Sequence, residues 1–304
     1  MDEAALRRIR ANFPCPTQPM GEAWFMGNER ALFKELLGDL GTLSAYELQR
    51  PLEEIASGTS CFGPLEEWTD WYHYLLGALL PRAHENFVYS LLEYLTTGFM
   101  AIYPTGVAEE PYPSFKRDML GTLGRMMMDP RCWQGSEIAV GAFLHRSNNN
   151  PRQVWCWWDA SGDLSSAFFL CLKYLDVAEV EGWFRSALVI PSPHWRAQVL
   201  AWLVGAHSCL LNGAWPSTFK TEASPSVEWA WSHCIGPELV QGDFRTNFDF
   251  LPVASRGKVL KLVNEYFTDE VYSDWLTSIS NVPYLQEELA EVLSRFEGIY
   301  LSSQ

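Results

Sequence analysis

The chain has 304 residues, of which 48% are hydrophobic and 19% are charged, so it can bury a large core and is neither disordered nor of low complexity. Its 22 Lys and Arg residues against 37 Asp and Glu residues give a net charge of −15. This balance argues against a basic nucleic-acid-binding surface and against attraction to an anionic membrane. We therefore expect neither nucleic acid nor a membrane among its partners.

Several features bear on where the chain resides. The opening residues, MDEAALRRIRANF, mix both charges and lack the apolar stretch of a secretory signal. No run of about 20 apolar residues occurs, and the segment 195–211 carries Arg196, Gln198 and His207, which favours a buried helix over a membrane span. The seven cysteines are odd in number and irregularly spaced, so no disulfide framework is expected. These features predict a reducing, cytoplasmic location.

Helix signals dominate the first part of the chain. Ser44 and Glu47 form a capping box, in which each side chain can satisfy an exposed backbone amide of the other residue. This box predicts a helix that breaks near Pro51 and stops at Gly58.

Two further helices are predicted next. Pro64 with acids in the following turn starts a helix that ends at Pro81. Residues 87–103 then carry an apolar stripe at helical spacing. The short connection between the two segments predicts a helical hairpin.

Short echoes of these helices recur later in the chain. The segment 71–85 resembles 195–209, and LLEYL at 91–95 resembles parts of 170–175 and 260–267. True duplication would give paired helices stacked on their neighbours, in a compact array rather than a regular solenoid. Chance similarity between Leu-rich helices is the alternative.

One stretch departs from the helical pattern. Glu137–Leu144 alternates apolar and other residues with the period of a strand, and Val154–Trp158 is rich in strand-favouring residues. We expect a β-hairpin over 137–158. The segment 212–227 is loop-like. The last two helices are expected to begin near Thr268 and Pro283.

The elements together predict a mainly α protein, built as a compact, repeat-like array of antiparallel helical hairpins with one β-hairpin near 137–158. We expect a single helical domain over 1–304. Its sub-divisions would be an N-terminal helical half at 1–135, the β-hairpin insert at 136–160 and a C-terminal helical half at 161–304.

Catalytic and cofactor motifs are missing from the sequence. Neither GxGxxG nor GxxxxGK[ST] occurs, and GTSCF at 58–62 has Phe62 where a nucleophile elbow requires a second Gly. Metal-ligand spacings are also missing: His207 with Cys209, and His233 with Cys234, are the nearest candidates, but neighbours two apart on a helix face different sides. We expect no catalytic residues, no cofactor and no metal site.

The 14 tryptophans are unusually many. Large rings fill gaps between helices, and this core role is the interpretation that we favour. Anchoring at a protein interface and stacking on sugars are the two alternatives.

Acidic residues are clustered in two places. Residues 47–70 carry a net charge of −5, and residues 262–304 carry a net charge of −7. Exposed helix faces often carry acids for solubility alone, but a concentrated negative field also attracts basic proteins. If the clusters bind a partner, the contributing residues are Glu53, Glu54, Glu66, Glu67, Asp70, Asp269, Glu270, Asp274, Glu287, Glu288 and Glu291.

The pattern EEWTDWYHYLLGALL followed by LLEYLTTGFMAIYP, at 66–104, resembles uncharacterised helical proteins grouped with bacterial toxin-system immunity proteins. The resemblance covers about 40 residues and has no diagnostic motif. It implies a non-enzymatic inhibitor of a cognate secreted toxin, such as a nuclease delivered by a type VI or contact-dependent system.

The leading hypothesis is therefore an acidic binding protein with a basic partner. The first alternative is a carbohydrate-active enzyme on an α/α barrel, for which the chain is short and lacks an evident carboxylate pair. The second is a helical-repeat scaffold with several partners. The sequence leaves a homodimer open.

Overall fold

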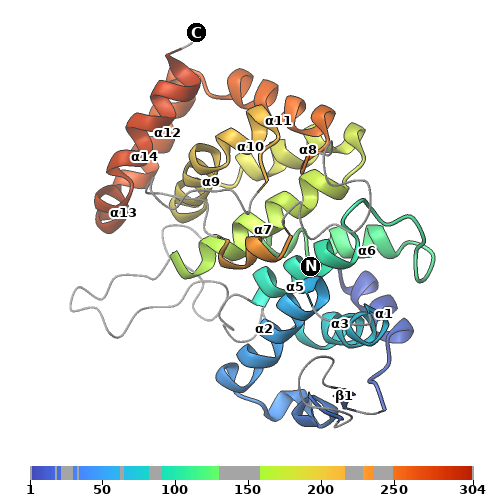
Figure 1. Cartoon of the computed structure of the whole chain (residues 1–304). Coiled ribbons are helices and arrows are strands. Elements are labelled where there is room, and N and C mark those ends of the chain that lie inside the picture. Colours follow the sequence, from blue (N-terminus) through green and yellow to red (C-terminus); the bar gives the residue numbers. More distant parts are fainter. Residues whose placement is uncertain are drawn as a thin grey trace.

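The protein is mainly α-helical, as predicted (Figure 1). One short antiparallel pair joins β1 (Met20–Gly21) to β2 (Arg30–Leu32). The predicted β-hairpin lies outside the described residues except for Trp158, which begins helix α7 (Trp158–Tyr174). This computed structural model describes residues 2–17, 19–21, 30–32, 34–61, 65–81, 91–129, 158–215, 229–235 and 249–302.

The N-terminal helices gather around one central helix, α5 (Leu91–Ile102). Helix α2 (Ala45–Cys61) and helix α3 (Leu65–Leu79) both pack on α5, and helix α1 (Glu3–Asn12) packs on α3. Two short 3-10 helices, Lys34–Leu37 and Leu40–Thr42, precede α2.

The start of α2 confirms the predicted capping box. The backbone N–H of Ser44 donates to the Glu47 carboxylate at 2.8 Å, and the Glu47 N–H donates to the Ser44 hydroxyl at 3.3 Å. The predicted break at Pro51 is wrong, because Pro51 lies inside a continuous helix that also runs past Gly58. Proline removes one backbone hydrogen bond, but the buried side chains of Leu52 and other α2 residues hold the helix against α5.

Helix α5 is buried along nearly its whole length, from Leu91 to Met100. In its first turn, a backbone N–H group that has no partner within the helix donates to another helix. The Glu93 N–H donates a hydrogen bond to the buried Asp163 carboxylate of α7 at 2.7 Å. The aromatic ring of Tyr72 packs directly against Gly98, where an added Cβ would meet ring carbons at 2.9 Å. Glycine at this position therefore sets the distance between α3 and α5.

The second half is held together by aromatic side chains. Helices α8 (Val177–Leu188) and α9 (Pro193–Gly205) pack with α7 around Phe168, whose ring contacts Trp183 of α8 and Trp202 of α9 edge to face. The predicted helical run at 195–211 is two helices. It is interrupted at Ala206, which ends α9 and precedes α10 (His207–Asn212).

The C-terminal part of the chain forms four helices: α11 (Val253–Tyr266), α12 (Asp269–Ser280), α13 (Pro283–Glu288) and α14 (Ala290–Phe296). A π-helical turn over Glu297–Leu301 follows α14. The predicted start near Thr268 is confirmed, since its hydroxyl accepts a hydrogen bond from the Val271 N–H at 3.3 Å. The helix predicted to begin at Pro283 ends after six residues, and α14 continues beyond it.

The described buried side chains form one connected apolar cluster, from Leu6 near the N-terminus to Tyr300 near the C-terminus. Shorter helices, α6 (Phe115–Gly121), Met126–Met128 and Ala230–Ile235, also contribute to it. Among the helices that the structure describes, none is both long and apolar enough to span a bilayer. The repeat-like pairing of helices and the sub-divisions of the domain stay predictions.

Candidate functional site

The acidic residues of α2 and α3 do not form one uniform surface. The Glu53 carboxylate accepts a hydrogen bond from the Tyr94 hydroxyl at 3.0 Å, and Glu54 pairs with Arg50 at 3.1 Å. Both carboxylates thus have partners within the fold. Farther along, Glu66 and Asp70 are exposed on α3, and Glu67 beside them is partly exposed.

The C-terminal acids are more accessible. Asp269 and Glu270 are exposed in the first turn of α12, where the helix dipole favours negative charge. Asp274 pairs with Arg196 of α9 at 3.0 Å, and Glu291 is exposed in the first turn of α14. Two more predicted residues, Glu287 and Glu288, lie at the end of α13, and their side chains are outside the described part.

Tyr272 joins α12 to α14 and brings one further acid into this region. Its hydroxyl donates to the Leu293 carbonyl at 3.1 Å, and its ring stacks on Phe296 at 5.3 Å. Burial, and then the neighbouring Glu297 carboxylate, raise the pKa of Tyr272. Asp269 lies one helical turn before Tyr272 on the same side of α12. We call Asp269, Glu270 and Glu297 the C-terminal acidic patch.

One exposed base, Arg295, lies in the last turn of α14, two residues before Glu297. On other helices some exposed acids pair with neighbouring bases, as in Glu181 with Arg185 at 3.2 Å and Glu265 with Lys261 at 3.7 Å. Within the described residues, none of the three patch carboxylates forms an ion pair. The patch is therefore a group of exposed carboxylates without a described ion pair.

The two acidic regions do not face one partner surface together. Helices α2 and α3 lie at one end of the molecule in Figure 1, whereas α12 to α14 lie at the opposite end, beyond α7 and α9. A partner that binds one region leaves the other free. The sequence predicted both clusters but could not show that the fold separates them.

The described tryptophans confirm the core interpretation. Seven of them are at most 4% exposed and belong to the apolar core, and Trp215 is partly buried and packs against it. The indole of Trp195, for example, donates to the Ala187 carbonyl at 2.6 Å. The rings concerned are those of Trp68, Trp71, Trp183, Trp195, Trp202, Trp229 and Trp275.

Three of the described cysteines, Cys171, Cys209 and Cys234, are buried, and Cys15 is exposed. His207 contacts the Tyr300 hydroxyl at 3.2 Å, and burial raises the pKa of the Cys209 thiol to about 12. Among the described residues, no three His, Cys, Asp or Glu side chains come close enough to hold a metal ion. Residues Gly58–Cys61 continue α2, a setting unlike the strand-to-helix turn of a nucleophile elbow.

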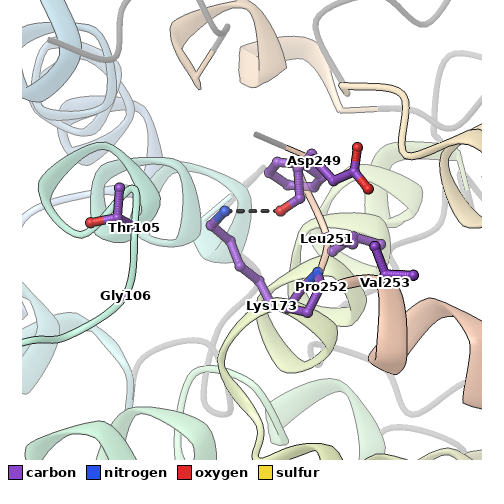
Figure 2. A pocket seen from close by; sticks show the side chains of 8 residues that line it. Thr105, Gly106, Lys173, Asp249, Leu251, Pro252 and Val253 are labelled. Carbon is purple, nitrogen blue, oxygen red and sulfur yellow. Dashed lines mark hydrogen bonds between the residues drawn. The ribbon is translucent and has the colours of Figure 1, made fainter. Parts of the chain in front are cut away.

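A cavity that sequence reasoning missed lies between the loop after α5 and the start of α11 (Figure 2). It has a volume of about 430 Å³. Its polar centre is Lys173, in the last turn of α7, whose Nζ donates to the Phe250 carbonyl at 2.9 Å. The cavity is lined by Thr105, Gly106, Lys173, Asp249, Phe250, Leu251, Pro252 and Val253.

The charged groups around this cavity are arranged in two separate sets. The Asp249 carboxylate points away from Lys173 in Figure 2 and pairs with Arg256 at 2.9 Å. Burial lowers the pKa of Lys173 to about 8. The only sequence signal was a lone lysine in the apolar run FFLCLKYL, which is also what a helix end at a surface would give.

Comparison of the chain with protein-family models, curated proteins and solved structures gave no match. The resemblance to immunity proteins at 66–104 therefore remains a prediction. Most of the described residues in this range fall in α3 and α5, where most side chains are buried, so they specify packing.

Proposed function

We propose that this protein is a non-enzymatic binding protein that holds a basic protein partner at its C-terminal acidic patch. One observation carries the proposal: Asp269, Glu270 and Glu297 are exposed and have no ion pair within the described residues. Such a group of carboxylates creates a negative field, which attracts the cationic surface of another protein.

The chemistry of the patch fits a partner that is itself positive at its working site. Carboxylates accept two parallel hydrogen bonds from an arginine side chain, so the patch can be specific as well as attractive. A nuclease must be positive where it holds phosphate. Covering that surface with acidic helices would exclude the nucleic acid and inhibit the enzyme.

The finer form of the proposal is an immunity protein that neutralises a cognate secreted bacterial toxin. The resemblance at 66–104 supports it, together with the net charge of −15. An array of antiparallel helical hairpins would serve this role as a rigid scaffold. Rigid partners lose little conformational entropy on association.

The test starts with capture of a partner from native host lysate on the immobilised protein, washed with rising salt. The captured partner is then bound to a patch variant, in which the carboxylates are neutralised by Asp269→Asn, Glu270→Gln and Glu297→Gln. We expect association to slow at least about tenfold at low salt and its salt dependence to flatten.

A matched control removes the same charge elsewhere. Glu109, Glu179 and Glu181 are exposed and lie outside the patch, and their replacement by Gln should leave binding nearly unchanged. Equal loss in both variants would show that only net charge matters and would overturn the patch. The immunity role requires in addition that host cells producing the partner survive only with this protein. Several weak partners would favour the scaffold alternative.

A further inference from the structure

We propose that the exposed side of α8 is a docking surface for a second copy of this chain, with the two α8 helices antiparallel across a two-fold axis. The surface lies on a different helix from the C-terminal acidic patch, and this inference does not depend on the proposed binding of a basic protein. We define the α8 face by four exposed residues on one side of the helix and at its end: Ala178, Gly182, Arg185 and Val189.

The opposite side of α8 is held by three other helices. The Trp183 ring packs on α7, and the Ala187 carbonyl accepts a hydrogen bond from the Trp195 indole of α9 at 2.6 Å. Helix α8 also packs beside α11 (Figure 1), where the Tyr266 hydroxyl donates to the Leu188 carbonyl at 2.9 Å. These contacts fix which side of α8 is turned to solvent.

Exposed apolar side chains are concentrated at α8. In the part of the chain that the structure describes, four large apolar side chains are strongly exposed, and two of them, Val177 and Val189, flank this helix. Val189 follows the last helical residue and is 62% exposed. Single exposed side chains of this kind are common, but two at the ends of one helix indicate a surface that another molecule covers.

The spacing of the α8 face makes it complementary to itself. Residues 178, 182, 185 and 189 follow one another at intervals of 4, 3 and 4, which places them along one line of a helix. The intervals are the same in both directions. An antiparallel copy therefore places Ala178 opposite Val189 of the second copy, and Gly182 opposite Arg185 of the second copy. A two-fold dimer requires a surface that matches itself in this way.

The small residues of the α8 face leave room for the large ones. A Cβ added at Gly182 would meet no atom within 4 Å, so the surface is open at this point. In the proposed pair, each Val189 side chain packs over Ala178 of the other copy. Removal of both valine side chains from water favours the association.

Glu181 and Arg185 make the pair complementary in charge. Within one chain they form an ion pair at 3.2 Å, and both side chains are about half exposed. Across the proposed axis, Arg185 lies opposite Gly182 of the second copy, so Glu181 of that copy is within reach of the long arginine side chain. Each carboxylate thus gains a second base and each guanidinium group a second acid.

A contact between two single helices is small. Helix α8 has 12 residues and is therefore about 18 Å long. Interfaces that bury less than about 1,200 Å² are typical of transient complexes. We therefore expect a reversible dimer that forms at micromolar or higher concentrations of the chain.

Sedimentation equilibrium of the full chain, from about 10 to about 500 µM, measures this self-association. We expect the average mass to rise with concentration from 34.6 kDa toward twice that value. Val189→Asp places an unpaired charge in the contact and should weaken association at least about tenfold. Val253→Asp is the matched control on α11, at a residue that is 63% exposed, and should leave association unchanged. A monomer at every concentration, or equal effects of the two variants, would overturn the proposal.

An exchange of charges tests the register of the two helices. In Arg185→Glu, two carboxylates meet across the axis, and in Glu181→Arg, two guanidinium groups meet, so each variant alone should remain a monomer. An equal mixture should form a heterodimer about as tight as the wild-type dimer, because each Glu again lies beside an Arg. Circular dichroism confirms that both variants are folded. Dimers of either variant alone, or no association in the mixture, would contradict the antiparallel pairing of α8.

Discussion

Burial of a single ionisable ring shows how strongly the core controls charge. His73 stacks on Phe13 with ring centres 4.2 Å apart, and its Nε2 lies 3.0 Å from the Tyr103 hydroxyl. The ring is 5% exposed, and burial lowers the pKa of His73 to about 4. An unfolded histidine titrates near 6.5, so between the two pKa values the unfolded chain binds the proton more tightly.

We predict that this difference makes the protein less stable in weak acid. Above about pH 6.5 both states hold a neutral ring, and as pH falls toward 4 protonation stabilises only the unfolded state. From pH 7 to pH 5, His73 should remove about 2 kcal/mol from the free energy of unfolding. Urea unfolding of the wild type and of His73→Gln at both pH values measures this contribution. Identical pH slopes in the two proteins would contradict it.

At the scale of single elements, the central helix α5 depends on close contact with α3. Tyr72 lies against Gly98, and its hydroxyl donates to the Leu95 carbonyl at 2.7 Å in the same buried contact. The ring is fixed at both its face and its tip. It cannot move aside without losing a buried hydrogen bond.

We therefore expect Gly98→Ala to destabilise the protein by about 1 to 3 kcal/mol, although alanine favours helix more than glycine does. Gly182→Ala on α8 is the matched control, because an added Cβ there meets no atom within 4 Å. That variant should gain up to about 1 kcal/mol from helix propensity alone. Urea unfolding midpoints measure both changes, and a stabilised Gly98→Ala would contradict the close contact.

These elements show which parts of the fold could be predicted from sequence. Local signals succeeded where the chain interacts with itself over a few residues, as at the Ser44 capping box and at Thr268. Expectations failed at Pro51, where packing on α5 outweighs a local penalty. They failed again at Ala206, where the helical run turns between α9 and α10. The failure at Pro51 arises from contacts with a helix that is distant in the sequence.

The candidate sites follow the same rule. Composition indicated the acidic helices, but only the fold shows that the Glu53 carboxylate accepts a hydrogen bond from Tyr94, whereas Glu297 of the C-terminal segment lies near Tyr272 of α12. Lys173 carried no recognisable motif. Its cavity forms from the loop after α5, the end of α7 and the residues at the start of α11, which are far apart in the chain.

At the scale of the whole molecule, a net charge of −15 means that the folded state repels itself. Exposed ion pairs such as Glu181 with Arg185 contribute little to stability, typically below about 1 kcal/mol. Repulsion should therefore dominate the response to salt. The Debye length falls from about 30 Å at 0.01 M salt to about 8 Å at 0.15 M, so salt screens repulsion across the molecule.

We predict that raising sodium chloride from 0.01 to 0.15 M increases the urea unfolding midpoint. The patch variant, in which Asp269, Glu270 and Glu297 are neutral, should lose more of this salt response than the control variant with Gln at the three other exposed acids. Like charges that form no ion pair repel most strongly, and their removal relieves most repulsion. If the two variants respond equally, the negative charge is spread evenly over the surface and the patch has no special field with which to attract a partner.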